Sequence, residues 1–260
     1  MPPCGCSQTD SIAPTGYAEA RGKKSHCLAD GATFLYRTGS EYRDIFPAWD
    51  WQRVPGITVE YLDAQPEPEL VRTRSTRPFV GGVSDGQYGM AAMDFHRGSL
   101  TAHKAWFFFD RDFVCLGSGI ACASEHPVRT SVEQCLARDS VNLAPTGSVG
   151  PTLLDEGIHT TSNPRWVSHN GVSYVFLSPV EVCVGITQQR GDWTEIGTGI
   201  GGGVSARVFG LWVEHGRGVL DAQYAYAVLA DVPDTTVAAY AEDPPVAVLA
   251  NTPSLQAVRH

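Results

Sequence analysis

Short apolar runs separated by turn-forming residues fill most of the chain, and they are clearest between residues 79 and 120. The runs at 88–95 and 100–109 are separated by the sequence HRGS, and a third run, FVCLGSGI, ends at Ile120. β-Branched and aromatic residues between clusters of Gly, Ser and Asp are typical of strands joined by turns. The pattern therefore predicts three consecutive strands in this stretch.

The middle run of the three is unusually aromatic. Trp106, Phe107, Phe108 and Phe109 are consecutive, so aromatic side chains fall on both faces of the predicted strand. A strand that is apolar on both faces is normally covered on both faces. We therefore expect stacked sheets, with this strand near the centre of the architecture.

Similar signals continue along the chain. Asn170-Gly171 between two apolar runs is the strongest hairpin signal. Residues 129–136 fit a strand or a helical turn, 235–241 fit a short helix, and 45–56, with two prolines and two tryptophans, fit a structured loop. Further strands are expected in ATFLYR, VEVCVGITQQ, SARVFGLWVEHG, AQYAYAVLA and PVAVLA, of which the last would close the sheet.

The order of these segments predicts one large domain. Residues 1–28 are polar, without periodicity, and are expected to be irregular, whereas residues 29–260 are expected to form a single β domain. Residues 63–76 read as an exposed connection within it. The content of 27 Gly and 17 Pro between short apolar runs favours an all-β fold over a helical one.

Composition limits the partners. No run of about 18 apolar residues occurs, so no membrane span is expected. The formal net charge of −9 argues against nucleic acid and anionic membranes as partners. The seven cysteines leave at least one unpaired within the chain, and their pairing is left open. No signal-peptide pattern is visible at the N-terminus.

Several stretches together carry a resemblance to a known family. TAHKAWFFFDRDFVCLGSGI resembles the core of the central β domain of family 8 polysaccharide lyases, which comprise hyaluronate, chondroitin AC and xanthan lyases. Further stretches resemble the same domain, and they occur in the same order as in that family. They are ADGATFLYRTGSEYRDIFPAWDWQRVPGITVE, WVSHNGVSYVFL, GDWTEIG, LWVEHGRGVLDAQYAYAVL and VAVLANTPSLQAVRH. The resemblance covers roughly residues 29–260 and implies an all-β, large antiparallel super-sandwich of several sheets.

The resemblance also implies an activity. Enzymes of this family cleave uronic-acid-containing polysaccharides by β-elimination, which needs neutralisation of the uronate carboxylate, a base and an acid. In the family these groups lie mostly on a helical toroid before the β domain, with a Glu and an Asn lent from just upstream of the segment matching Asp30-Gly31. Here that region reads GYAEARGKKSHCLADG and does not match, so neither Glu19 nor any other residue is assigned a catalytic role.

Three functional hypotheses follow. The first is the β-sandwich domain of a lyase, incomplete without its helical toroid and extracellular like the family. The second is a non-catalytic carbohydrate-binding β-sandwich, and the third is a partner of a separately encoded helical chain. An exposed apolar patch where the toroid would dock favours the first, and a polar face there favours the second.

Candidate substrate-binding residues were chosen for their chemistry. Trp49 and Trp51 offer rings that stack on sugars, and Arg53 can pair with a carboxylate. Packing of both tryptophans against the sheet is the favoured alternative. His103 and Lys104 begin the aromatic strand and point to opposite faces, and a core histidine is again the favoured alternative.

Metal sites have little support in the sequence. The eight histidines form no HxH or HExxH pattern, so no catalytic metal is expected. Some relatives hold a structural calcium in the β domain, and such a site needs clustered oxygen ligands. Four acidic residues follow the Pro-Gly turn: Glu60, Asp63, Glu67 and Glu69. Their spacing is more typical of a solvated acidic loop than of a calcium site.

Overall fold

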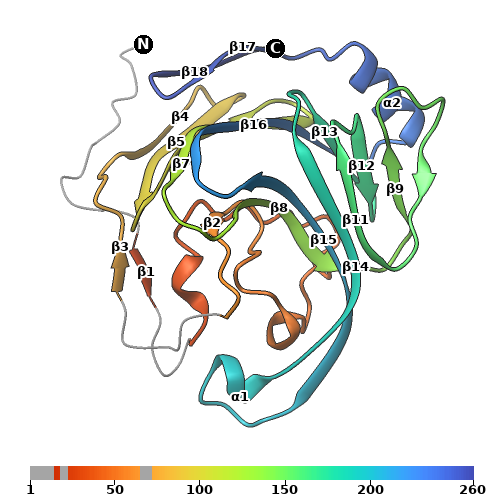
Figure 1. The fold of residues 1–260 in the computed structure, drawn as a ribbon. Helices are drawn as coiled ribbons and strands as arrows, with labels where there is room; N and C mark the ends of the chain where they lie inside the picture. Colours follow the sequence, from red (N-terminus) through yellow and green to blue (C-terminus); the bar gives the residue numbers. More distant parts are fainter. Residues whose placement is uncertain (1–14, 18–22, 65–71) are drawn as a thin grey trace.

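Two large antiparallel sheets lie face to face in the computed structural model, which describes residues 15–17, 23–64 and 72–260 (Figure 1). In spatial order the nine-stranded sheet contains β10 (Thr152–Leu153), β9 (Val141–Ala144), β12 (Trp166–His169), β13 (Val172–Phe176), β16 (Val219–Ala230), β7 (Asp112–Cys122), β6 (Leu100–Phe108), β5 (Gly89–Arg97) and β4 (Val80–Ser84). The five-stranded sheet contains β11 (Gly157–Ser162), β14 (Glu181–Asp192), β15 (Gly203–Gly216), β8 (Val128–Leu136) and β2 (Thr58–Glu60).

Smaller elements complete the described part of the chain. Two-stranded sheets pair β1 (Thr15–Tyr17) with β3 (Arg72–Arg74), and β17 (Ala247–Thr252) with β18 (Leu255–Arg259). The helices are α1 (Trp193–Ile196), α2 (Asp234–Glu242) and the 3₁₀ turns η1 (Ser25–Cys27) and η2 (Phe46–Ala48). No helix in the described ranges is both long and apolar enough to span a bilayer.

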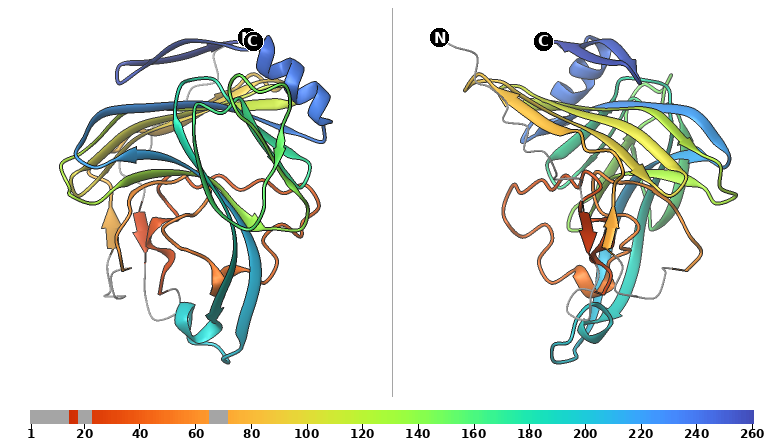
Figure 2. Two further views of the ribbon diagram at one scale, coloured as in Figure 1. Left: turned by 45° about the vertical axis from the view of Figure 1, so that its right-hand side comes forward. Right: turned by 90° about the vertical axis from the view of Figure 1, so that its left-hand side faces the viewer.

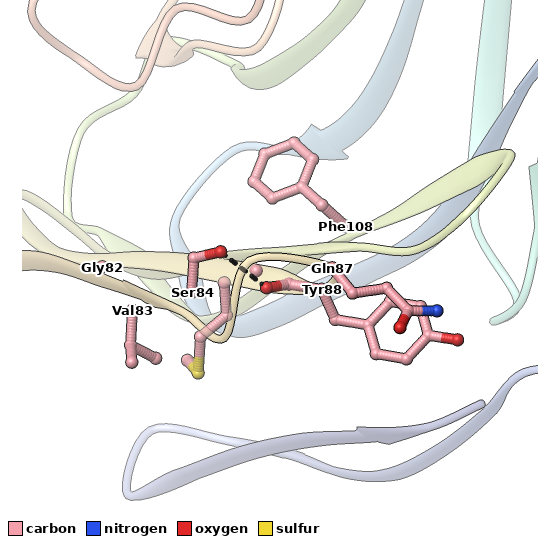
Figure 3. Close-up of a pocket in the computed structure, with 8 residues that line it drawn as sticks. Gly82, Val83, Ser84, Gln87, Tyr88 and Phe108 are labelled. Carbon is pink, nitrogen blue, oxygen red and sulfur yellow. Dashed lines mark hydrogen bonds between the residues drawn. The ribbon is translucent and has the colours of Figure 1, made fainter. Parts of the chain in front are cut away.

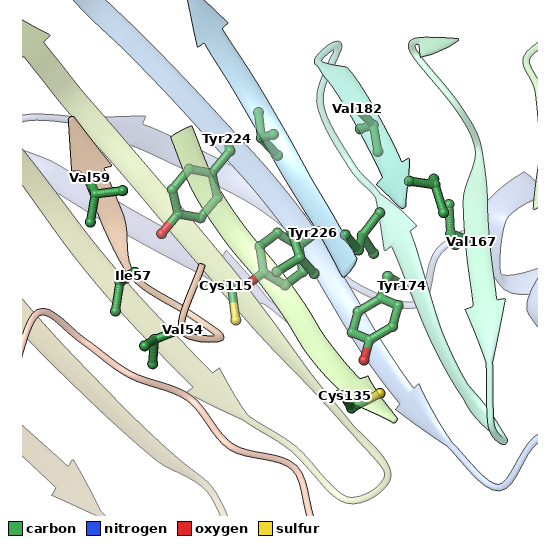
Figure 4. Packing of buried hydrophobic residues seen from close by; sticks show 14 of the residues in the cluster. Val54, Ile57, Val59, Cys115, Cys135, Val167, Tyr174, Val182, Tyr224 and Tyr226 are labelled. Atoms are coloured by element: carbon green, nitrogen blue, oxygen red, sulfur yellow. The ribbon is translucent and has the colours of Figure 1, made fainter. Parts of the chain in front are cut away.

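The main core fills the space between the two large sheets. Alternate side chains point into it, as Val182, Tyr174 and Tyr226 do in Figure 4. The irregular segment 31–57 adds buried side chains to the same core. The two sheets and this segment therefore bury one continuous apolar interior.

A second, smaller core lies on the other face of the nine-stranded sheet. It packs β6, β7 and β16 against α2 and the β17–β18 ribbon, so the molecule has three layers (Figure 2). Trp106 packs against the main core and Phe107 lies in the second, which explains why aromatic residues occupy both faces of β6. Phe108 is 42% exposed, and β6 lies third from the β4 edge rather than near the centre as expected.

Most of the predicted elements are confirmed. The three predicted strands between residues 79 and 120 are β5, β6 and β7, and 129–136 falls within β8. β4 is an additional strand in the same stretch. Asn170 and Gly171 have φ of 51° and 69°, as the tight turn between β12 and β13 requires. The predicted all-β architecture of antiparallel sheets is therefore correct.

One predicted strand is wrong, and a second is confirmed as a strand but lies outside the sheet in which it was expected. ATFLYR is irregular, because its backbone bonds to loops: Thr33 N donates to Pro55 O. PVAVLA does not close the large sheet, because β17 pairs with β18 in a separate ribbon. The predicted connection at 63–76 lies partly outside the described residues, and its last part forms β3.

The segment before residue 29 contacts the domain where it is described. Lys23 N donates to Ile196 O at the end of the long β14–β15 hairpin, 3.1 Å away. Lys24 forms an ion pair with Glu195 in α1, and Cys27 is buried in the main core. The domain boundary at residue 29 stays a prediction.

Candidate functional site

Trp49 and Trp51 lie inside the molecule, with 5% and 8% of their surface exposed. Their indole N–H groups donate to the backbone oxygens of Gln134 and Phe46, each over 3.1 Å. The rings meet edge to face with centroids 5.6 Å apart. Since neither ring offers a free face, the sugar-stacking role expected for them is not supported, and they pack as core residues.

Arg53 is held among groups of the protein itself. Its guanidinium lies 3.8 Å from the ring centroid of Trp212 and 5.1 Å from that of Tyr61. Its Nε is 3.3 Å from a carboxylate oxygen of Asp50, and its side chain is 15% exposed. Cation–π stacking and an acidic neighbour account for this arginine, so its position does not favour contact with substrate.

Lys104 is buried and points toward the main core side of β6, with 1% of its surface exposed. Its Nζ donates to Asp30 O over 3.0 Å and to Gly56 O. Burial lowers the pKa of Lys104 to about 8. Because two backbone carbonyls already accept hydrogen bonds from the ammonium group, its position does not favour contact with substrate, and the expected role in substrate binding stays a prediction.

A charged pair that was not predicted from the sequence lies next to Lys104. The Asp30 carboxylate is buried and accepts a hydrogen bond from Arg97, which also donates to His26 O over 2.9 Å. Burial raises the pKa of Asp30 to about 7, against the attraction of Arg97 and Lys104. The sequence carried one sign of this cluster: two cationic residues, Arg97 and Lys104, on neighbouring strands that are otherwise mostly apolar. The cluster fixes the segment around residues 26–30 to the nine-stranded sheet.

His103 is the most accessible of the five predicted residues, with a side chain 35% exposed. It lies on the opposite face of β6 from Lys104. Its Nε2 is 3.6 Å from one carboxylate oxygen of Asp94 on β5, and Arg77 Nε is 3.9 Å from the other. We call Arg77, Asp94 and His103 the surface row. The row combines a cation able to pair with a carboxylate and an imidazole beside an acid.

The described residues contain no group of three or more His, Cys, Asp or Glu side chains placed to hold a metal ion. Glu60 accepts a hydrogen bond from Ser124, and Glu67 and Glu69 lie outside the described residues. The five cysteines in the described part are free and buried; they are Cys27, Cys115, Cys122, Cys135 and Cys183.

Comparison with known families defines the class of protein. The profile of polysaccharide lyase family 8, super-sandwich domain, matches residues 11–241. The chain belongs to this family, in agreement with the resemblance found in the sequence.

Individual relatives give the same answer. The chain is 37% identical to chondroitinase-AC of Pedobacter heparinus over 90% of its own length and 33% of the relative's. It is 30% identical to xanthan lyase of a Bacillus species, over 88% and 26%. A solved chondroitinase AC lyase superposes with a TM-score of 0.83 at 34% identity, covering 95% of this chain and 38% of that one. The chain thus spans about a third of the length of these relatives.

Proposed function

We propose that the chain is the β-sandwich part of an enzyme that cleaves uronic-acid-containing polysaccharides by β-elimination, together with a helical domain. The observation that carries the proposal is the match to chondroitinase-AC, with 37% identity over 90% of the chain. Similarity to xanthan lyase and to hyaluronate lyase of Thermasporomyces composti, the latter 31% identical, supports a polysaccharide substrate.

The surface row is the part of the described chain that we assign to substrate contact. Arg77 is suited to a uronate carboxylate, and His103 is suited to a hydrogen bond with a sugar hydroxyl. Asp94 lies between them and orients both side chains. We assign the proton transfers of the elimination to the helical domain, because the two groups of the row that can exchange a proton, His103 and Asp94, are already paired with each other, and Asp94 also with Arg77.

The test measures the unsaturated uronate product of the elimination by its ultraviolet absorbance. The chain is assayed alone and fused to the helical part of chondroitinase-AC, with hyaluronan, chondroitin sulfate, alginate and xanthan as substrates. We expect product from the fusion on at least one substrate and none from either part alone. Product from the chain alone would contradict the need for a helical domain.

Variants of the fusion test the surface row. Arg77→Ala and His103→Ala are expected to raise KM, whereas His159→Ala on β11 is the matched control and leaves it unchanged. If the fusion binds these polysaccharides on affinity gels but releases no product from any of them, the chain is a carbohydrate-binding module instead.

A further inference from the structure

A hollow of about 530 Å³ opens at the turn between β4 and β5 (Figure 3). Its lining includes Ser84, Gln87, Tyr88, Gly89 and Phe108. None of the three residues of the surface row lines it, and Met90, the lining residue of β5 nearest to Asp94, lies four positions away, about 13 Å along an extended strand. The hollow is therefore separate from the surface row.

Two aromatic rings of the lining are held in place by the protein. Phe108 is 42% exposed, and its ring packs against Phe113 with centroids 5.6 Å apart. Tyr88 meets Phe109 edge to face at 5.8 Å, and its hydroxyl donates to Asp110 over 3.3 Å. The two rings lie on opposite sides of the strands, so one sugar ring can stack on only one of them (Figure 3). Because the Phe108 ring is already fixed, it loses little conformational freedom when a ligand stacks on it.

The charges around the hollow select against acidic ligands. None of the eight residues that line it has a charged side chain. Two carboxylates are bonded to Tyr88 of the lining: Asp85, whose Oδ1 accepts from Tyr88 N over 2.7 Å, and Asp110, which accepts from the Tyr88 hydroxyl. A polyanion would be repelled by both, whereas an uncharged ligand would not.

A sugar ring matches this lining. Its C–H face can stack on an aromatic ring, and its hydroxyl groups can bond to nearby hydroxyl and amide groups. Gln87 supplies an amide group at the rim of the hollow. The Ser84 hydroxyl donates to Tyr88 O and accepts from Gly86 N, which leaves it one lone pair to accept a hydrogen bond from a sugar hydroxyl. We propose that this hollow binds an uncharged sugar residue of a polysaccharide, with the ring stacked on Phe108.

The test titrates the whole chain with neutral hexasaccharides of glucose, xylose and N-acetylglucosamine, and with a hyaluronan hexasaccharide as the acidic comparison, by calorimetry. We expect at least one neutral oligosaccharide to bind and Phe108→Ala to weaken it at least about tenfold. Phe79→Ala is the matched control, because Phe79 is 53% exposed but does not line the hollow, and it should leave binding unchanged.

A second variant separates binding from folding. A Cβ added at Gly89 would have its nearest neighbour, Val83 O, at 3.6 Å, so Gly89→Ala fits the fold. The added methyl group narrows the hollow and is expected to weaken binding with an unchanged Tm.

Three results would overturn the proposal: no neutral oligosaccharide binds at about 10 mM, Phe79→Ala weakens binding as much as Phe108→Ala, or Gly89→Ala binds like the wild type. Hyaluronan binding that survives Phe108→Ala belongs to the proposed function of the surface row. The two proposals can therefore fail independently.

Discussion

The carboxyl group of Glu133 offers a direct test of how the space between the sheets is packed. It is 5% exposed and accepts hydrogen bonds from the hydroxyls of Tyr42, over 2.9 Å, and Tyr174, over 3.0 Å. Burial raises its pKa from 4.5 to about 7, although these hydrogen bonds favour the charged form.

The raised pKa makes the free energy of unfolding depend on pH. Between pH 4.5 and pH 7 the folded chain keeps a proton on Glu133 that the unfolded chain has lost. The folded state therefore binds more protons, and its stability falls as pH rises through this range. The difference between the two pKa values corresponds to about 3 kcal/mol, present below pH 4.5 and lost above pH 7.

Glu133→Gln removes this titration and keeps the shape of the side chain. Urea unfolding of the variant and the wild type is compared at pH 4.5 and pH 8. We expect the variant to gain about 3 kcal/mol relative to the wild type between the two pH values. Glu181→Gln, at an exposed position of β14, is the control. If the difference between Glu133→Gln and the wild type stays constant with pH, the argument from burial is refuted.

Three further outcomes are expected. Burial lowers the pKa of His215 to about 4, so the unfolded chain takes up a proton first as pH falls. The contribution of this residue to stability should therefore drop by about 3 kcal/mol from pH 6.5 to pH 4, opposite in sign to that of Glu133, and His215→Gln should gain this amount relative to the wild type when urea unfolding is compared at the two pH values. Gly191→Ala should cost about 1–3 kcal/mol in urea unfolding, because its Cβ would lie 1.7 Å from Pro47 O, whereas Gly203→Ala, with open space around its Cβ, should cost almost nothing. Arg53→Ala should lose about 1–2 kcal/mol of stability through its aromatic stack and leave polysaccharide binding unchanged.

Strands marked by local signals were predictable from the sequence. The β12–β13 hairpin depends on two residues that accept positive φ, and β5 to β7 depend on apolar runs broken by turn residues. ATFLYR carried the same local signal but failed, because its hydrogen-bonding partners come from the loop near Pro55. Partners that are distant in sequence cannot be read from a short pattern.

The candidate site was less predictable for the same reason. Alternation along β6 correctly placed His103 and Lys104 on opposite faces, but it could not say which face is covered. Lys104 is buried because the backbone oxygens of Asp30 and Gly56 meet at its ammonium group. Trp49 and Trp51 show a second limit of prediction from sequence. The composition of a loop does not reveal whether its aromatic rings point toward the core or toward solvent.

The pairing of β7 with β16 has a consequence for how the chain folds. β4 to β7 are joined by short turns and can form as successive hairpins. The next neighbour of β7 is β16, where Leu116 pairs with Ala225, 109 positions later. Contacts between such distant residues slow folding, because a long loop must close before they form. A chain still on the ribosome and ending before β16 would therefore present the long edge of β7 unpaired, and completing the sheet must wait until nearly the whole domain has been synthesised.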